Sequence, residues 1–241
     1  MVAKFKLLIS KAKDIKYMSM LNKNERSLIK TILHKKLTYL SKARLACILL
    51  SLKDIKAKNL KGSVIEAGCA LGGSSILISK FKRNEADFSI YDVFGMIPPP
   101  SDKDDELVHK RYNTILKGES SGLGGELYYG YEENLYDKVL ENFEDFNVNV
   151  KESNISLVKG LVQDTMNINE PIVFAHIDVD WYDPVKTCLE QIWPNLVTNG
   201  CIILDDYYYW GGCKKATDEF FLNKTDYIME NNSGSMKVIK L

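Results

Sequence analysis

Hydrophobic residues in the first sixty positions of the chain recur with the spacing of an α-helix. Leu45, Ile48, Leu49 and Leu52 illustrate the pattern. Steps of three and four residues place such side chains on one side of a helix. The pattern therefore predicts an N-terminal helical extension over residues 1–60.

The pattern changes after residue 60, where short apolar runs alternate with longer helix-like stretches. Continuous apolar strands separated by helices are typical of a parallel sheet that is buried on both faces. The strands that we expect cover residues 63–67, 88–92, 155–159, 172–178 and 201–205. Two further runs, 226–230 and 236–241, flank the turn-like sequence NNSG and predict an antiparallel hairpin. The sequence thus predicts one α/β domain over residues 61–241, with a mostly parallel, doubly wound sheet.

Residues 94–131 do not follow this alternation. They contain three consecutive prolines, a charged stretch, a glycine-rich stretch and an aromatic run at residues 128–131. Long connections inside compact domains are usually functional lids or disordered segments. Because this one is rich in aromatic residues, we expect a lid that orders around a ligand.

Composition adds a charge asymmetry to this picture. The chain has no net charge, but residues 1–61 carry 16 Lys and Arg against three Asp and Glu. This region is either a set of solvated helix faces or a positive surface that attracts an anionic partner. The five cysteines lack CxxC or metal-like spacing, which is typical of reduced thiols in a cytoplasmic protein. No apolar run approaches the roughly 18 residues of a membrane span, and residues 5–9 are too charged for a signal-peptide core.

The stretch VIEAGCALGGSS, at residues 64–75, has the form of a strand, a glycine-rich turn and the start of a helix. In doubly wound folds such a turn holds nucleotide-like ligands. Gly68 lets the backbone turn sharply, and the pair Gly72 and Gly73 would admit a ligand close to the chain. We therefore predict cofactor contacts at Gly68, Gly72 and Ser74.

Two acidic residues accompany this turn. Glu66 precedes it, where a carboxylate would suit a positive group such as the amino group of a methionine moiety. Asp92 ends the next expected strand and is placed to accept hydrogen bonds from ribose hydroxyls. Ala70 stands where the dinucleotide motif G-x-G-x-x-G has its second glycine, which disfavours NAD. The turn alone is compatible with a purely structural role, but the combination indicates S-adenosylmethionine.

Aspartates gather where two neighbouring strands are expected to end. Asp178 and Asp180 follow one apolar run, and the next strand ends in Asp205 and Asp206. Parallel strands lie roughly 5 Å apart, and their carboxyl ends form the ligand crevice of such folds. Converging carboxylates repel each other unless a cation is present, and oxygen-only ligands favour Mg²⁺ or Ca²⁺ over zinc. We expect Asp178, Asp205 and Asp206 to hold Mg²⁺ and Asp180 to act as a base; helix capping or a solvated loop is the alternative.

Taken in order, these motifs resemble the macrocin O-methyltransferase family over residues 60–222. The segments that carry the resemblance are EAG at 66–68, DVF at 92–94, DT at 164–165, HIDVDWY at 176–182 and LDDYYYWGGCKKATDEFF at 204–221. The resemblance implies a Rossmann-like class I methyltransferase that uses S-adenosylmethionine and Mg²⁺ to methylate a sugar hydroxyl. It also implies metal ligation by Asp178, Asp205 and Asp206, catalytic roles for Asp178 and Asp180, and a position near the adenine for Asp164.

For partners, the resemblance implies a sugar or nucleotide-sugar acceptor and a homo-oligomer, with neither nucleic acid nor a membrane bound. Residues 207–210 form an aromatic run after the aspartate pair, which either packs at the sheet edge or forms a wall that faces the sugar. Three alternatives stay open: a nucleotide-sugar glycosyltransferase that uses Asp178-Val-Asp180 as its metal motif, an NAD-dependent oxidoreductase, and a non-catalytic binding module with the methyltransferase fold.

Overall fold

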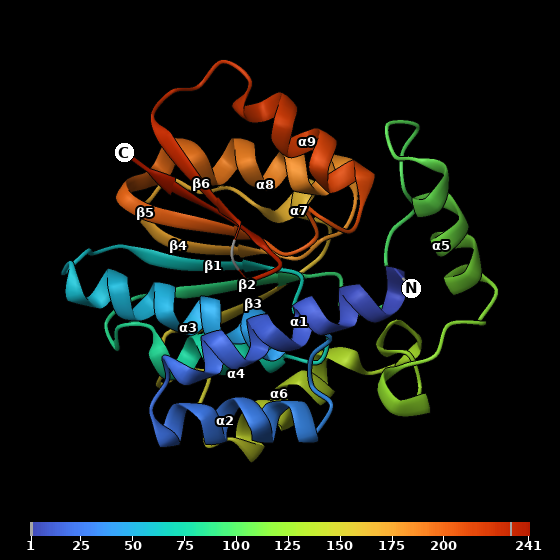
Figure 1. The fold of residues 1–241 in the computed structure, drawn as a ribbon, viewed down its shortest axis with the longest axis horizontal. Helices are drawn as coiled ribbons and strands as arrows, with labels where there is room; N and C mark the ends of the chain where they lie inside the picture. Colours follow the sequence, from blue (N-terminus) through green and yellow to red (C-terminus); the bar gives the residue numbers. More distant parts are fainter. Residues whose placement is uncertain (1, 232) are drawn as a thin grey trace.

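A central sheet of seven strands lies between two layers of helices in the computed structural model, which describes residues 2–231 and 233–241 (Figure 1). The strand order is β3-β2-β1-β4-β5-β7-β6. The first five strands pair in parallel, and β7 pairs antiparallel with both β5 and β6. The strands are β1 (Ser63–Ala67), β2 (Phe88–Asp92), β3 (Ile155–Lys159), β4 (Ile172–Ile177), β5 (Leu196–Leu204), β6 (Tyr227–Asn231) and β7 (Met236–Lys240).

The helices divide between the two faces of this sheet. One face is covered by α1 to α4 and α6, and the other by α7, α8 and α9, while α5 stands to one side (Figure 1). The α-helices are α1 (Val2–Ser19), α2 (Lys23–His34), α3 (Lys42–Ala57), α4 (Gly73–Phe81), α5 (Glu106–Leu116), α6 (Leu135–Asp145), α7 (Val162–Thr165), α8 (Tyr182–Asn195) and α9 (Gly211–Phe221). The doubly wound α/β class and the closing hairpin that the sequence predicts are confirmed.

The predicted strands agree with the structure except near β5. This strand begins at Leu196, whereas the sequence indicated residue 201. The intervening residues include Asn199, whose φ of 64° is in the left-handed region, and Gly200. Such residues usually mark a turn, but here they accompany an irregularity in the pairing of β5 with β4. The prediction was wrong because a bulge and a turn share the same residue signals.

The N-terminal helices share a core with the sheet. Ile48 and Leu49 of α3 are fully buried, in one hydrophobic cluster with Val64 of β1 and Phe174 of β4. Burial of such a side chain contributes about 1.5–3 kcal/mol. The extension predicted over residues 1–60 is therefore packed against the sheet, which brings α3 close to the strand ends.

The predicted lid, residues 94–131, holds α5 and two short 3₁₀ turns, Leu123–Gly125 and Tyr129–Tyr131. Ile97 and Val108 of this segment share a small hydrophobic cluster with Trp181, which follows β4. The indole Nε1–H of Trp181 also donates a hydrogen bond of 2.9 Å to the Pro98 carbonyl. The segment is thus docked on the loop that follows β4.

Two further expectations concern the chain as a whole. The five cysteines are all free and buried, as expected for reduced thiols. Among the described residues, no helix combines the length and the apolar character that crossing a bilayer would require.

Candidate active site

The turn after β1 is shaped by contact with the end of β4. Gly68 has a φ of 82°, and a Cβ atom placed on it would lie 1.9 Å from the carbonyl oxygen of Asp178. Only glycine fits both this left-handed conformation and this close approach. The amide of Asp178 in turn donates a hydrogen bond of 2.8 Å to the Ala67 carbonyl. The glycine turn and the first metal-ligand candidate are therefore neighbours.

Asp92, at the end of β2, holds the same turn from its other side. Its Oδ2 accepts hydrogen bonds from the amides of Cys69, at 2.8 Å, and Ala70, at 3.2 Å. Its Oδ1 accepts from the amide of Phe94, at 2.7 Å. Burial raises the pKa of Asp92, and these amide hydrogen bonds oppose that rise. Asp92 therefore orders the turn and also faces the cavity described below.

The glycine pair Gly72 and Gly73 packs closely against other parts of the protein. A Cβ atom on Gly73 would lie 2.5 Å from the Leu37 carbonyl oxygen, and one on Gly72 would lie 3.3 Å from a methyl group of Val139. The small residues admit the chain segment after α2 and helix α6, so packing inside the protein already requires glycine at this pair, and ligand approach here stays a prediction. Ser74 is buried, and neither it nor Gly72 lines the cavity nearby.

Glu66 lies in β1 directly before the turn and makes its contacts inside the protein. It has no exposed surface, and its Oε1 lies 2.8 Å from Nδ1 of His176, which is equally buried. Its Oε2 accepts a hydrogen bond from the Ser75 hydroxyl. With both oxygens engaged inside the protein, Glu66 joins β1, β4 and α4, and it does not contact the cavity that a cofactor would occupy.

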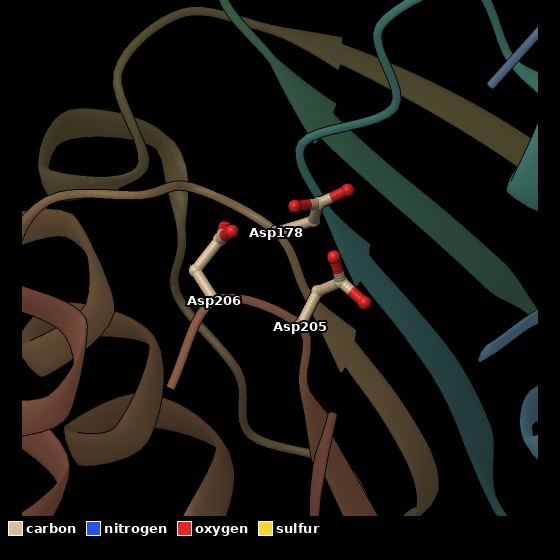
Figure 2. Close-up of side chains that lie close together, drawn as sticks. All are labelled: Asp178, Asp205 and Asp206. Carbon is tan, nitrogen blue, oxygen red and sulfur yellow. The ribbon is translucent and has the colours of Figure 1, made fainter. Parts of the chain in front are cut away.

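The three predicted metal ligands do converge. One carboxylate oxygen from each of Asp178, Asp205 and Asp206 lies within 4.8 Å of the other two. Figure 2 shows the three side chains at the tips of two neighbouring strands, with their carboxylates facing a common space. The amide of Asp205 donates to the Ile177 carbonyl at 3.0 Å, which fixes the two strand tips together.

The carboxylates of this cluster are unequally satisfied. Oδ1 of Asp205 accepts from the Ser235 hydroxyl at 2.8 Å, and its Oδ2 pairs with Nη1 of Arg44 at 2.5 Å. Oδ2 of Asp206 is buried and has no hydrogen-bond partner among the described residues. Burial and the neighbouring carboxylate of Asp205 raise the pKa of Asp178 to about 7. A buried oxygen without a donor, in a set of oxygen-only ligands, fits a hard divalent cation such as Mg²⁺.

Asp180 lies two residues beyond Asp178 in a left-handed backbone conformation, with a φ of 55°. This conformation is uncommon for a non-glycine residue and tends to persist at functional sites. Burial raises the pKa of its carboxyl to about 6. A carboxylate with a raised pKa is a stronger base than an ordinary aspartate, as the predicted role requires.

Two adjoining cavities meet at these residues. The first lies over the glycine turn and is lined by Asp92 and by residues 160–163 after β3. The second lies under the lid and is lined by the metal-ligand candidates and by Arg111 and Trp210. The residues that line both are Gly68, Asp92, Ile97, Tyr129, Asp178 and Asp180. Asp178 and Asp180 thus stand where contents of the two cavities would meet.

The remaining predicted residues have mixed positions. Asp164 lies exposed on α7, directly after Gln163 of the first cavity, but does not line that cavity. In the aromatic run, Tyr207 is buried and donates to Asp218, whereas Trp210 lines the second cavity. Tyr207 is therefore packed, as the first interpretation expects, and a sugar-facing role for Trp210 stays a prediction.

Sequence reasoning did not identify Arg44 or Arg111 as part of the site. Both line the second cavity, although Arg44 lies on α3 and Arg111 on α5. The chain contains 32 Lys and Arg residues, of which only four are arginine: Arg26, Arg44, Arg83 and Arg111. The rarity of arginine was the available signal, because arginine and lysine are not interchangeable in binding sites.

The sequence of the chain matches a known protein family. Residues 3–230 match the family described as Macrocin-O-methyltransferase (TylF). A curated relative, demethyldecarbamoylnovobiocin O-methyltransferase from Streptomyces niveus, is 23% identical over 187 residues. That alignment spans 73% of this chain and 64% of the relative, less than two thirds of its length.

Solved structures show the same fold. The O-methyltransferase NovP superposes with a TM-score of 0.69 at 20% identity, over 85% of this chain and 81% of NovP. CalS11, described as a calicheamicin methyltransferase, gives a TM-score of 0.55 at 16% identity, over 91% of this chain and 94% of CalS11. In a second solved structure, CalS11 is described as a TDP-rhamnose 3'-O-methyltransferase. These likenesses confirm the Rossmann-like class I methyltransferase fold.

Proposed function

Because the chain belongs to the macrocin O-methyltransferase family, we propose that it transfers a methyl group from S-adenosylmethionine to a hydroxyl of a sugar, with Mg²⁺ bound by Asp178, Asp205 and Asp206. The observation that carries the proposal is the convergence of these three carboxylates at the junction of two cavities. One cavity suits the methyl donor and the other suits the acceptor. The family favours methyl transfer over the glycosyltransferase, oxidoreductase and non-catalytic alternatives.

Cofactor binding is assigned to the first cavity. Its walls are the turn at Gly68, the carboxylate of Asp92 and the backbone after β3, all at the carboxyl ends of parallel strands. This is where doubly wound folds bind nucleotide-like ligands, and an acid at the end of the second strand suits ribose hydroxyls. We therefore assign direct cofactor contacts to Gly68 and Asp92. Glu66, Gly72 and Ser74 do not line the cavity, and we assign them the role of stabilising the turn that holds the cofactor.

The charge of the two cavities supports a cationic cofactor and a metal. Among the described residues, five carboxylates line them, those of Asp92, Asp178, Asp180, Asp205 and Asp206, but only two guanidinium groups do. Buried carboxylates at this density do not all ionise without added positive charge. A divalent cation and a sulfonium together carry the three positive charges that balance the difference. This balance favours an acceptor without net charge at the reacting group.

The chemistry requires a sugar hydroxyl to lose its proton while it is aligned with the methyl donor. A bound Mg²⁺ would polarise and orient the hydroxyl oxygen. Asp180, which faces both cavities, would accept the proton, an effect of about 10²–10⁴-fold when a base is well placed. Alignment of the two reactants by the cavity walls is worth about 7–11 kcal/mol.

The second cavity has walls that suit a sugar. Tyr39, Tyr128 and Trp210 line it, and flat aromatic faces pack well against the C–H groups of a carbohydrate. The Tyr39 and Tyr129 rings contact each other edge to face, with centroids 5.8 Å apart, so the N-terminal region and the lid form one continuous wall. The acceptor is either a glycoside or, as described for CalS11, a nucleotide-linked sugar.

The proposal is tested by supplying radiolabelled S-adenosylmethionine and a panel of nucleotide sugars and glycosides, with Mg²⁺ or with a chelator. We expect methylated product only with Mg²⁺. The Asp178→Ala variant should lose turnover but bind S-adenosylhomocysteine within about threefold of the wild type, because Gly68, Asp92 and residues 160–163 still line the cofactor cavity. Full activity of the wild type in chelator would refute the metal, and failure to bind S-adenosylhomocysteine would refute methyl transfer.

A further inference from the structure

Arg44 places a cation from the N-terminal region directly on the aspartate cluster. It lies in the first turn of α3, and its Nη1 is 2.5 Å from Oδ2 of Asp205. The two side chains are only 12% and 3% exposed. The guanidinium carbon is also 4.2 Å from the centroid of the Tyr209 ring, a cation–π arrangement. The contact is therefore an almost fully buried ion pair.

Asp205 does not depend on Arg44 alone to hold its position. Its other oxygen accepts a hydrogen bond from the Ser235 hydroxyl, and its amide is tied to β4 through the Ile177 carbonyl. Its neighbour Asp206 keeps a buried oxygen without a partner among the described residues. The pair with Arg44 thus neutralises one carboxylate of a cluster whose members already share a common space (Figure 2).

We propose that Arg44 is the internal counter-ion of this cluster and competes with the divalent cation for Asp205. The inference rests on the proposed metal site. Oδ2 of Asp205 can pair with the guanidinium or serve a divalent ion, but the two cations repel each other at such a distance. Arg44 therefore withdraws from this oxygen when metal binds, and the Tyr209 ring retains its guanidinium at the wall of the second cavity. Arg44 is a positioning residue, and it couples metal loading to helix α3.

The sign of the effect separates competition from support. If Arg44 only held Asp205 in place, its removal would weaken metal binding. If Arg44 competes, its removal leaves Asp205 held by Ser235 and raises the affinity. Removal of one positive charge beside the site should strengthen the binding of a divalent cation by about tenfold or more, since the repulsion in a partly buried site is large.

The experiment is a calorimetric titration of Mn²⁺ and of Mg²⁺ into the metal-free full-length protein. We compare the wild type with Arg44→Met, which removes the charge, and Arg44→Lys, which keeps it. Arg26→Met is the matched control, because Arg26 lies on α2 and lines neither cavity. We expect Arg44→Met to bind metal at least about tenfold more tightly, and the other two variants to stay within about threefold of the wild type. Equal or weaker binding by Arg44→Met overturns the inference.

A measurement on the wild type keeps the inference falsifiable if Arg44→Met does not fold. With only four arginines in the chain, selective ¹⁵N labelling gives four guanidinium signals that substitutions can assign. We expect saturating Mg²⁺ to shift the Arg44 signal and to speed the exchange of its protons with water, while the Arg26 signal stays unchanged. If the Arg44 signal stays unchanged when Mg²⁺ is bound, the inference about Arg44 is wrong but the metal site stands. If the wild type binds no metal, both the inference and the proposed metal site are wrong.

Discussion

Asp180 combines three properties at one position. It lines both cavities, its backbone is held at a φ of 55°, and burial raises its pKa to about 6. Each property has an ordinary structural explanation on its own. Together they describe a carboxylate that lies where the two cavities meet and that is more basic than an ordinary aspartate, as the proposed base requires.

We predict that Asp180→Asn lowers kcat by about 10²–10⁴-fold, because the amide cannot accept the acceptor's proton. The affinity for S-adenosylhomocysteine and for Mn²⁺ should change little, since Asp180 is not one of the three clustered ligands. Steady-state kinetics and calorimetry provide the two measurements. Asp183→Asn is the control from the first turn of α8, because Asp183 pairs with Lys103 at the surface. A loss of kcat equal in both variants would contradict the role of Asp180.

The sequence indicated the aspartates better than it indicated their partners. Asp178, Asp205 and Asp206 were predictable because they follow apolar strands, and neighbouring parallel strands end at one edge of a sheet. The contact between Arg44 and Asp205 joins residues 161 positions apart. The rarity of arginine sets Arg44 apart from the lysines around it, but no local pattern indicates that its partner is Asp205. The partner of Glu66 was missed for a similar reason, because His176 is brought to it only by the pairing of β1 with β4.

Secondary-structure elements position the site through close backbone contacts. The turn after β1 touches the loop after β4 at Gly68, and the lid touches the start of α8 through Asp104. The contact at Gly68 results from the strand order, and the contact at Asp104 results from the docking of the long connection. The glycine in the sequence indicates the first contact, whereas nothing in the charged stretch around Asp104 distinguishes that residue from its neighbours.

For the turn, we predict that Gly68→Ala destabilises the protein by about 3 kcal/mol or more, because a Cβ atom would lie 1.9 Å from the Asp178 carbonyl oxygen. Gly118→Ala is the control. Gly118 has a similar φ of 75° but no atom within 4 Å of the added Cβ, so only the backbone conformation costs energy, about 1–2 kcal/mol. Urea unfolding measures both variants. Equal losses of unfolding free energy in the two variants would show that the close contact between Gly68 and the Asp178 carbonyl does not require glycine.

For the lid, Asp104 is the anchoring residue. Its carboxylate is buried and accepts hydrogen bonds from the amides of Tyr182, at 2.9 Å, and Ser101, at 3.0 Å. We predict that Asp104→Ala costs about 1–3 kcal/mol, because a buried amide at the start of α8 loses its acceptor. The KM for the acceptor should rise, and limited proteolysis should cut the lid faster. Asp102→Ala, in the exposed part of the same segment, should change none of these.

The molecule as a whole joins an N-terminal helical region to a methyltransferase sheet through one core. Helices α1 to α3 share a hydrophobic cluster with the strands. Two residues of this N-terminal region, Tyr39 and Arg44, line the second cavity. One basic residue of the positively charged N-terminal region, Arg44, thus forms an ion pair inside the protein. The predicted homo-oligomer remains a prediction, as does the division of the chain at residue 60.

The acidic cluster should make the stability of the metal-free protein depend on pH. Burial raises the pKa of Asp178 to about 7 and of Asp180 to about 6, and it raises that of Asp206 as well. A carboxyl group whose pKa is higher in the folded state binds more protons there than when unfolded. Its contribution to stability is therefore largest at low pH and is lost as the pH rises through the folded pKa.

We predict that the Tm measured in chelator falls by several degrees between about pH 5.5 and pH 8, and that saturating Mg²⁺ removes most of this fall. Thermal unfolding followed by circular dichroism across this range provides the test. The Asp206→Asn variant should show a smaller fall, because one of the repelling charges is absent. A Tm that is constant or rises with pH in chelator would contradict the arrangement of charges.

The most direct test of the central claim is a crystal structure with Mn²⁺ and S-adenosylhomocysteine, with anomalous diffraction recorded for manganese. We predict one anomalous peak bonded to an oxygen of each of Asp178, Asp205 and Asp206, with the homocysteine sulfur in the adjoining cavity over Gly68. A structure in which S-adenosylhomocysteine is bound but manganese is absent from these three carboxylates would contradict the account.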